Sequence, residues 1–174
     1  MMTDAVRLML FPAMMLFPVL MAFAASSDLL TMTISNRISL ILVAGFLAAA
    51  LVIGMPLTTS AAHVGAGGLV LLVAFVFFTQ GWIGGGDAKL AAATALWLGF
   101  DHLVAYLIYA SLIGGMLTLV LLQLRNLPLP SVLAGQPWVV RLHSKESGIP
   151  YGIALAASAL IVYPETIWMR SITG

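Results

Sequence analysis

Carboxylic acids are the side chains of this sequence best suited to chemistry, and there are only six of them. The sequence contains no cysteine, which excludes disulfides, thiolate metal sites and a cysteine nucleophile. It also has no His-Glu-x-x-His motif of zinc proteases and no Gly-x-Ser-x-Gly elbow. Any chemistry therefore uses oxygen or imidazole groups. The six acids are Asp4, Asp28, Asp87, Asp101, Glu146 and Glu165.

Two of these acids stand in unusual local sequences. Asp28 follows Ser26 and Ser27, and Asp87 ends the run Gly84-Gly85-Gly86-Asp87. Either aspartate could be a simple helix cap. Three consecutive glycines, however, each cost about 1 kcal/mol of helix propensity relative to alanine. Such a run therefore indicates backbone flexibility or the close approach of another chain.

Two carboxyl groups on one face of a helical bundle would suit aspartic protease chemistry. Like charges at close range do not both ionise easily, so the pair holds one proton between its members. The ionised member takes a proton from an attacking water, and the protonated member hydrogen-bonds the peptide carbonyl oxygen. This chemistry needs no metal and no other cofactor.

The composition predicts an integral membrane protein. Of the 174 residues, 62% are hydrophobic and only 7% are charged, whereas soluble domains carry about 25% charged residues. The mean hydropathy is +1.12. A net charge of +1 gives no basic face for phosphates, so we expect membrane lipid around the protein and no nucleic acid partner.

Apolar stretches predict one all-α domain over residues 1–174 with six transmembrane helices. Asp101 and His102 interrupt a long apolar stretch and predict a tight hairpin between two of the helices. We expect the first span to be retained rather than cleaved as a signal peptide. The expected spans are 6–25, 38–55, 64–79, 84–100, 103–124 and 149–168, with a cytoplasmic loop at 125–148.

Basic residues predict the orientation, because loops rich in Lys and Arg stay in the cytoplasm. With six spans, one side carries five of them and the other side carries Arg7 and Arg170. Asp28, Asp87 and Glu146 would then share the cytoplasmic face, and both termini would lie outside it. The five basic residues are Arg37, Lys89, Arg125, Arg141 and Lys145.

Three ordered motifs resemble the bacterial prepilin peptidase family of membrane aspartic proteases. They are Asp28 followed by Ile34 and Asn36, then Gly84-x-Gly86-Asp87 with Lys89, then Pro150-Tyr151-Gly152. Their order and spacing look most like the short CpaA/TadV-type branch, which serves Flp-type pili. The resemblance covers nearly the whole chain.

The resemblance implies the roles of particular residues. Asp28 and Asp87 correspond to the catalytic pair. Ser35 stands where the family usually has proline in Ile-Pro-Asn, a departure that concerns the rigidity of this loop. Residues implied to bind substrate or support the loops are Asn36, Gly84, Gly86, Lys89, Pro150, Tyr151 and Gly152.

The resemblance also implies the substrate. The enzyme would cleave the leader peptide from Flp-type prepilins, or from pseudopilins, at the cytoplasmic face of the bacterial inner membrane. Such substrates have a basic leader, a glycine just before the cut and a hydrophobic helix after it. Longer relatives carry a cysteine-containing N-terminal region associated with N-methylation, so we expect this chain to cleave without methylating.

Three other interpretations remain open at this stage. His63, Asp101 and His102 could converge on the outer face as a metal site. Lys89 could serve a Ser/Lys protease. The chain could also be a non-enzymatic six-helix membrane protein, such as a small transporter or a pilus or secretion assembly factor, although its spans hold few polar residues to line a path.

Overall fold

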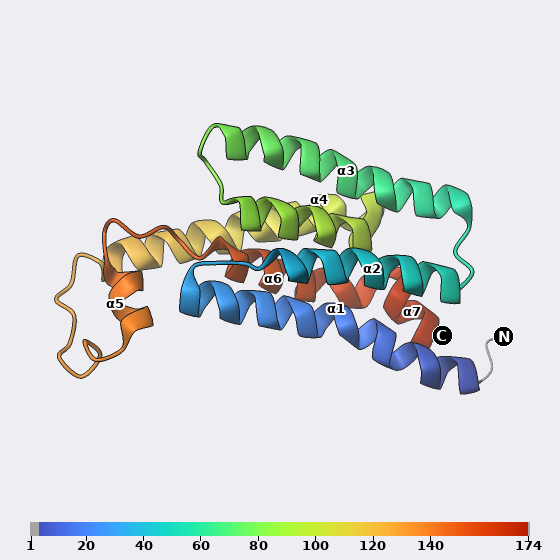
Figure 1. The fold of residues 1–174 in the computed structure, drawn as a ribbon, viewed down its shortest axis with the longest axis horizontal. Coiled ribbons are helices and arrows are strands. Elements are labelled where there is room, and N and C mark those ends of the chain that lie inside the picture. Colours follow the sequence, from blue (N-terminus) through green and yellow to red (C-terminus); the bar gives the residue numbers. More distant parts are fainter. Residues whose placement is uncertain (1–3, 174) are drawn as a thin grey trace.

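The computed structural model describes the backbone of residues 4–173 and the side chains of residues 14–170. These residues form a bundle of helices without any strand (Figure 1), which confirms the all-α fold. The elements are α1 (Asp4–Thr31), α2 (Asn36–Val52), α3 (Leu57–Thr79), α4 (Gly85–Leu124), α5 (Pro137–His143), α6 (Tyr151–Val162), η1 (Tyr163–Glu165) and α7 (Ile167–Thr173).

Three helical segments in the described part of the chain are long and apolar enough to cross a membrane. They are Met14–Thr31 of α1, all of α3 and all of α4. Asn36–Val52 and Tyr151–Glu165 are shorter apolar helices. The membrane nature of the protein is thus confirmed, and the number of six spans stays a prediction.

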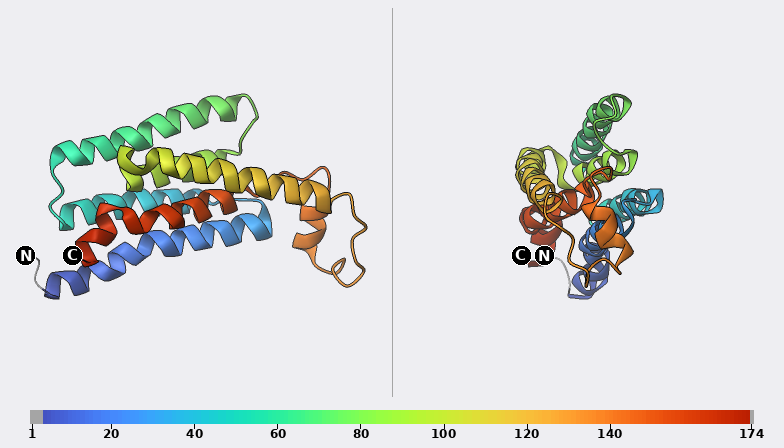
Figure 2. Two further views of the ribbon diagram at one scale, coloured as in Figure 1. Left: turned by 180° about the vertical axis from the view of Figure 1, so that it is seen from behind. Right: turned by 90° about the vertical axis from the view of Figure 1, so that its left-hand side faces the viewer.

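The long helix α4 folds back on itself at Gly99. This residue has φ +67° and ψ −178°, a conformation that residues with a Cβ rarely adopt. The first limb (residues 85–98) and the second limb (residues 100–124) run side by side in opposite directions (Figures 1 and 2). The hairpin expected at Asp101–His102 therefore exists, but its turn lies at the preceding glycine.

Helix α1 extends to Thr31, six residues past the expected end of the first span. The Thr31 hydroxyl donates to the Ser27 carbonyl at 2.7 Å, and the Met32 N–H donates to the Asp28 carbonyl at 2.8 Å. These bonds let a polar sequence continue the helix. Asp28 consequently lies in the last turn of α1. The sequence had placed it in a loop after the first span, and this part of the prediction was wrong.

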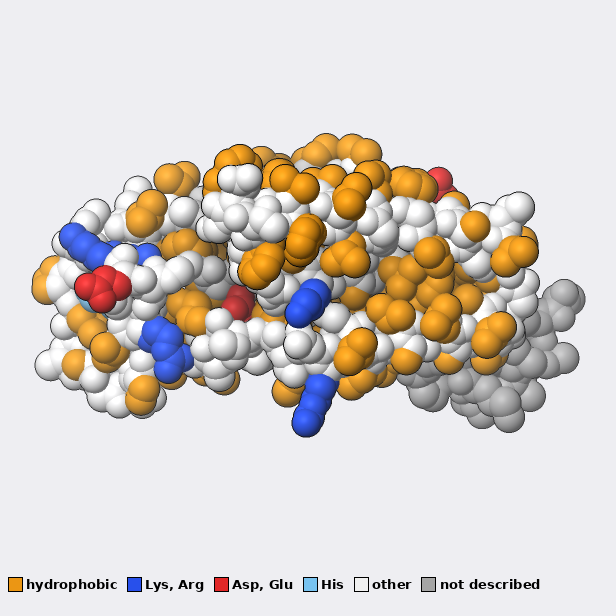
Figure 3. Space-filling view, turned by 45° about the horizontal axis from the view of Figure 1, so that its top comes forward, with side chains coloured by type: hydrophobic (Ala, Val, Ile, Leu, Met, Phe, Trp, Pro, Cys, Tyr) orange, Lys and Arg blue, Asp and Glu red, His pale blue; other side chains and the backbone are white. Residues whose placement is uncertain are grey.

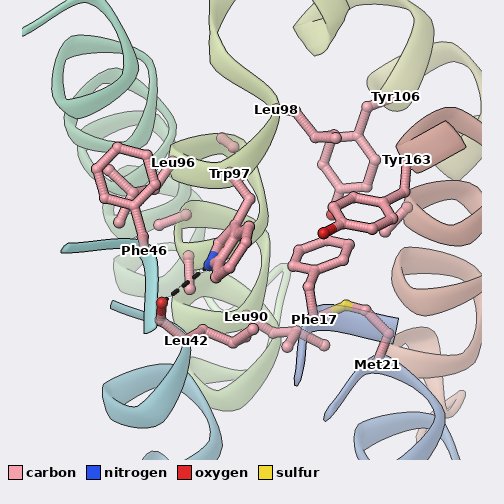
Figure 4. Packing of buried hydrophobic residues seen from close by; sticks show 14 of the residues in the cluster. Phe17, Met21, Leu42, Phe46, Leu90, Leu96, Trp97, Leu98, Tyr106 and Tyr163 are labelled. Carbon is pink, nitrogen blue, oxygen red and sulfur yellow. Dashed lines mark hydrogen bonds between the residues drawn. The ribbon is translucent and has the colours of Figure 1, made fainter. Parts of the chain in front are cut away.

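A cluster of buried aromatic residues joins the helices at the end of the first limb of α4 farthest from Asp87. The Trp97 indole N–H donates to the Leu42 carbonyl at 2.8 Å (Figure 4). The Trp168 indole donates to the Trp97 carbonyl at 2.6 Å, and the Tyr163 hydroxyl donates to the Met14 carbonyl at 2.9 Å. Because each of these polar tips has a hydrogen-bond partner, the rings are buried without leaving a donor unpaired. They fix α1, α2, α4 and the C-terminal helices relative to one another.

The opposite end of the bundle carries α5 and the polar connections. The Arg125 side chain donates to the carbonyls of Leu142 and Gly148 at 2.8 and 2.7 Å, and Arg141 donates to the Leu30 carbonyl at 2.6 Å. These bonds tie the connection after α4 to the bundle. In Figure 3, Lys and Arg side chains lie over this end and the middle of the visible face, and hydrophobic surface covers much of the rest.

Candidate active site

Asp28 is held at the start of α6. Its side chain is only 5% exposed, and its Oδ2 accepts the Gly152 backbone N–H at 2.7 Å. Gly152 is the second residue of α6, so this N–H has no partner within its own helix. The bond connects the last turn of α1 to the first turn of α6.

Asp87 occupies the first turn of α4. Its Oδ2 lies 2.9 Å from the point where a Cβ at Gly84 would stand, so the carboxyl group folds back over the residue that caps the helix. The other oxygen, Oδ1, is buried and has no hydrogen-bond partner among the described residues. A negative charge at a helix N-terminus is favourable, whereas the unpaired buried oxygen leaves part of the hydrogen-bonding capacity of the carboxyl group unused.

Ile34 lies between the first turns of α4 and α6. A Cβ at Gly86 would stand 3.1 Å from the Ile34 Cβ, and a Cβ at Gly152 would stand 2.7 Å from the Ile34 Cδ1. Ile34 thus adjoins both the glycine that precedes Asp87 and the glycine whose N–H binds Asp28. The glycines therefore provide the space in which α1, α4, α6 and the loop after α1 meet.

The connection between Asp28 and α2 is also fixed. The Lys89 ammonium donates to the Asn36 side-chain oxygen at 2.8 Å. Ser35 caps α2 by accepting the Arg37 N–H at 3.3 Å, and its φ is −66°, a value that proline also adopts. Serine therefore keeps the backbone geometry that a proline would impose at this position and adds a helix cap.

Pro150 and Tyr151 set the start of α6. Pro150 is buried and directly precedes the helix. The Tyr151 hydroxyl donates to the Ala110 carbonyl at 3.3 Å, and its ring lies where a Cβ at Gly114 would be. These contacts with the second limb of α4 place the Gly152 N–H opposite Asp28.

The structure thus brings all the sequence-predicted site residues to one end of the bundle. Sequence reasoning quoted Ile34 only as part of a motif and missed its position between the two glycines. It also missed Ala110 and Gly114, which receive Tyr151. The small residues of the second limb were a signal for close packing, but the sequence does not reveal which aromatic side chain packs there.

The three residues considered for an outer-face metal site do not form one. No group of three possible metal ligands occurs in the part of the chain that the structure describes. His63 lies within α3 rather than in a loop and is buried against Phe46 and Trp168. Its Nδ1 is 2.8 Å from the Leu96 carbonyl oxygen. His63 therefore packs in the aromatic core, whereas Asp101 is exposed.

The chain matches a known protein family. The type IV leader peptidase family matches residues 15–119, a segment that contains both Asp28 and Asp87. The chain belongs to the type IV leader peptidase family. This membership confirms the resemblance seen in the motifs, and assignment to the short CpaA/TadV-type branch stays a prediction.

One curated relative gives a second point of comparison for this leader peptidase family member. The chain is 34% identical over 159 residues to the prepilin leader peptidase/N-methyltransferase of Bacillus subtilis (strain 168). The alignment covers 91% of this chain and 57% of the relative, so the chain spans little more than half the length of that protein. No solved structure matches the chain.

Proposed function

We propose that the chain is an aspartic endopeptidase that removes the leader peptide from type IV prepilins, Flp-type pilins in particular, with Asp28 and Asp87 as its catalytic pair. The observation that carries this proposal is the position of the two carboxyl groups at one end of the bundle, each at a helix end packed against glycine, with Ile34 in contact with glycines on both sides of the site. Family membership and the prepilin-processing relative support the substrate class.

The reaction would need only these two carboxyl groups and water. One carboxylate takes a proton from the water whose oxygen bonds to the peptide carbonyl carbon. The other carboxyl group donates a hydrogen bond to the carbonyl oxygen, where negative charge develops. Collapse of the tetrahedral intermediate breaks the C–N bond, and a proton from the pair goes to the leaving amine.

We further propose that the site faces the cytoplasm at the inner membrane. Support comes from the basic residues, since Lys89 adjoins Asn36 near Asp87 and Arg141 contacts the end of α1 near Asp28. With the site at the cytoplasmic surface of the membrane, the basic leader of the substrate lies in water while its hydrophobic helix stays in lipid. Partition of that helix into the bilayer then brings the scissile bond to the carboxyl groups.

Co-expression with candidate prepilins and pseudopilins tests the proposed function. We expect the chain to shorten a Flp-type prepilin by its leader, seen as a shift in gel mobility and as a new N-terminus after the glycine. The cells must lack other prepilin peptidases. If the chain accumulates in the membrane and none of the candidates is shortened, the proposed activity is wrong.

The orientation gives a separate prediction. Reporter fusions after Arg37, Lys89 and Lys145 are expected to report the cytoplasm, and fusions near His63, near Asp101 and at the C-terminus are expected to report the opposite side, because loops with more basic residues stay inside. Alkaline phosphatase and green fluorescent protein activities measure the two sides. Opposite results for Arg37 and Lys89 would separate the two aspartates and reject the shared site.

The product gives another prediction. We expect this 174-residue chain to leave an unmodified amine on the mature pilin, since the sequence has no cysteine and the family resemblance associates paired cysteines with methylation. Mass spectrometry of pilin processed by the purified chain, with S-adenosylmethionine present, measures the mass of the new N-terminus. An added methyl group would contradict the expectation and match the name of the Bacillus relative.

A further inference from the structure

An apolar groove begins at Asp87 and runs along the bundle between α3 and the second limb of α4. We call it the Asp87 groove; its volume is about 320 Å³. The first limb of α4 and α6 also contribute to it. Among the residues that line it, Asp87 is the only charged one. Its walls include Leu69, Val73, Phe77, Leu103 and Leu107.

The groove opens toward the lipid. On its two walls, Val73 is 45% and Leu107 is 42% exposed. Alanines at 74, 91 and 110 line it as well, and their small side chains leave the space empty. Leu69 and Phe77 are eight positions apart in α3, so this wall is about 12 Å long, or roughly two helical turns.

We propose that the Asp87 groove binds the first two turns of the apolar segment that follows the scissile bond of the substrate. This inference rests on the proposed function. A peptide bond held at Asp87 must continue along the enzyme surface, and the groove is an apolar path that starts at this carboxyl group. The Asp87 side chain lines the head of the groove, and its buried Oδ1 has no partner among the described residues.

Shape must supply the specificity of this docking. Lipid is as apolar as the substrate helix, so the hydrophobic effect gains little when the helix leaves lipid for protein. Van der Waals packing does favour the protein over lipid when the shape of the groove fits the substrate helix. Bulky side chains that fill the groove should therefore displace the substrate even when they are apolar.

A second groove provides the competing location. It lies between α2 and α3, has a volume of about 530 Å³ and includes Asn36, Lys89, Leu71 and Ala93. We call it the Lys89 groove. It is larger, but neither aspartate lines it, and Lys89 and Asn36 bind each other at its head. A segment seated there would not continue directly from a peptide bond held at Asp87.

Cysteine cross-linking can separate the two grooves, since the chain has no cysteine of its own. Leu71 and Val73 lie two positions apart in α3, are 47% and 45% exposed, and line the Lys89 and Asp87 grooves respectively. Each is changed to cysteine in the Asp28→Asn background, which keeps the substrate intact. The substrate is a Flp-type prepilin with a single cysteine in the first two turns of its apolar segment.

We expect oxidation of the membranes to link the prepilin to Val73→Cys and not to Leu71→Cys, because a disulfide requires Cα atoms within about 7 Å. In the otherwise unchanged enzyme, Val73→Trp should lower kcat/KM by about a hundredfold, the effect of displacing reacting groups by an ångström. Leu71→Trp, at matched exposure, should leave kcat/KM within about twofold, the size of a change of roughly 0.4 kcal/mol in binding.

Cross-linking through Leu71→Cys, or none through Val73→Cys, would overturn the inference. So would full activity of Val73→Trp. The unmodified chain is assayed with the same prepilin in parallel. If the unmodified chain cleaves the prepilin but Val73→Cys forms no cross-link, only the docking inference is wrong. If the unmodified chain does not cleave the prepilin, the proposed function is wrong and so is the inference that rests on it.

Discussion

Changing either Asp28 or Asp87 to asparagine is expected to reduce leader cleavage to background. Asparagine keeps the shape of the side chain and its hydrogen-bonding capacity but cannot take up or release a proton. General acid–base catalysis contributes about 10²–10⁴-fold to a rate, and each single variant should lose at least this factor. The double variant should be no worse than either single one, because residues that perform one step together lose it together.

Exposed acids provide matched controls for this experiment. Asp101 lies just beyond the turn of α4 and Glu146 lies in the connection to α6, and both are exposed. Asp101→Asn and Glu146→Gln should retain most activity. Immunoblots of the prepilin and of the membrane-inserted enzyme measure cleavage and abundance. Substantial cleavage by Asp28→Asn at normal abundance would reject the aspartic mechanism, and equal loss in Asp101→Asn would redirect attention to the other end of the bundle.

The sequence predicted which residues meet because the motifs lie where helices begin or end. Asp28 is at the end of the first helix, Asp87 at the start of another, and Gly152 at the start of α6. In a bundle of helices joined by short connections, such ends fall on a common face when the intervening spans are counted correctly. The family resemblance singled out the residues at the start of α6, and the glycine run at residues 84–86 indicated the start of α4.

The exact ends of the helices were less predictable. Polar residues after Ala25 looked like a loop, yet the hydroxyl groups of Ser26 and Thr31 bind carbonyls within α1 and the helix continues through Asp28. Similarly, Asp101 and His102 looked like the hairpin because they are polar, whereas the backbone reverses at Gly99. Local hydrogen bonds determine where α1 ends, and the conformational freedom of glycine determines where α4 turns. A hydropathy profile contains neither kind of information.

His63 shows a different limit of sequence reading. A histidine next to an expected span boundary looked like a polar loop residue, but it is buried where Gly99 gives it room. A Cβ at Gly99 would stand 2.9 Å from the His63 Cε1. This burial depends on a contact between α3 and α4 that is distant in sequence, so no local pattern could predict it.

The second large effect is expected for Gly152→Ala. A Cβ at this position would stand 2.8 Å from the Asp28 Oδ2 and 3.1 Å from the Asp28 Cβ. Contacts below 3 Å are not tolerated, so the carboxyl group must move away from the N–H that now binds it at 2.7 Å. We expect cleavage to fall by about a hundredfold, the cost of misplacing a reacting group by an ångström, while the protein remains inserted in the membrane.

Two comparisons separate this effect from a general loss of structure. Alanine is favoured over glycine within a helix by about 1 kcal/mol, so the substitution does not weaken α6 itself. At Gly148, four residues earlier, a Cβ would meet no atom within 4 Å, and Gly148→Ala should cleave normally. Activity is measured as prepilin shortened per amount of membrane-inserted enzyme. Normal cleavage by Gly152→Ala would mean that the position of Asp28 against α6 is not required for the reaction, and the catalytic role of this contact would have to be abandoned.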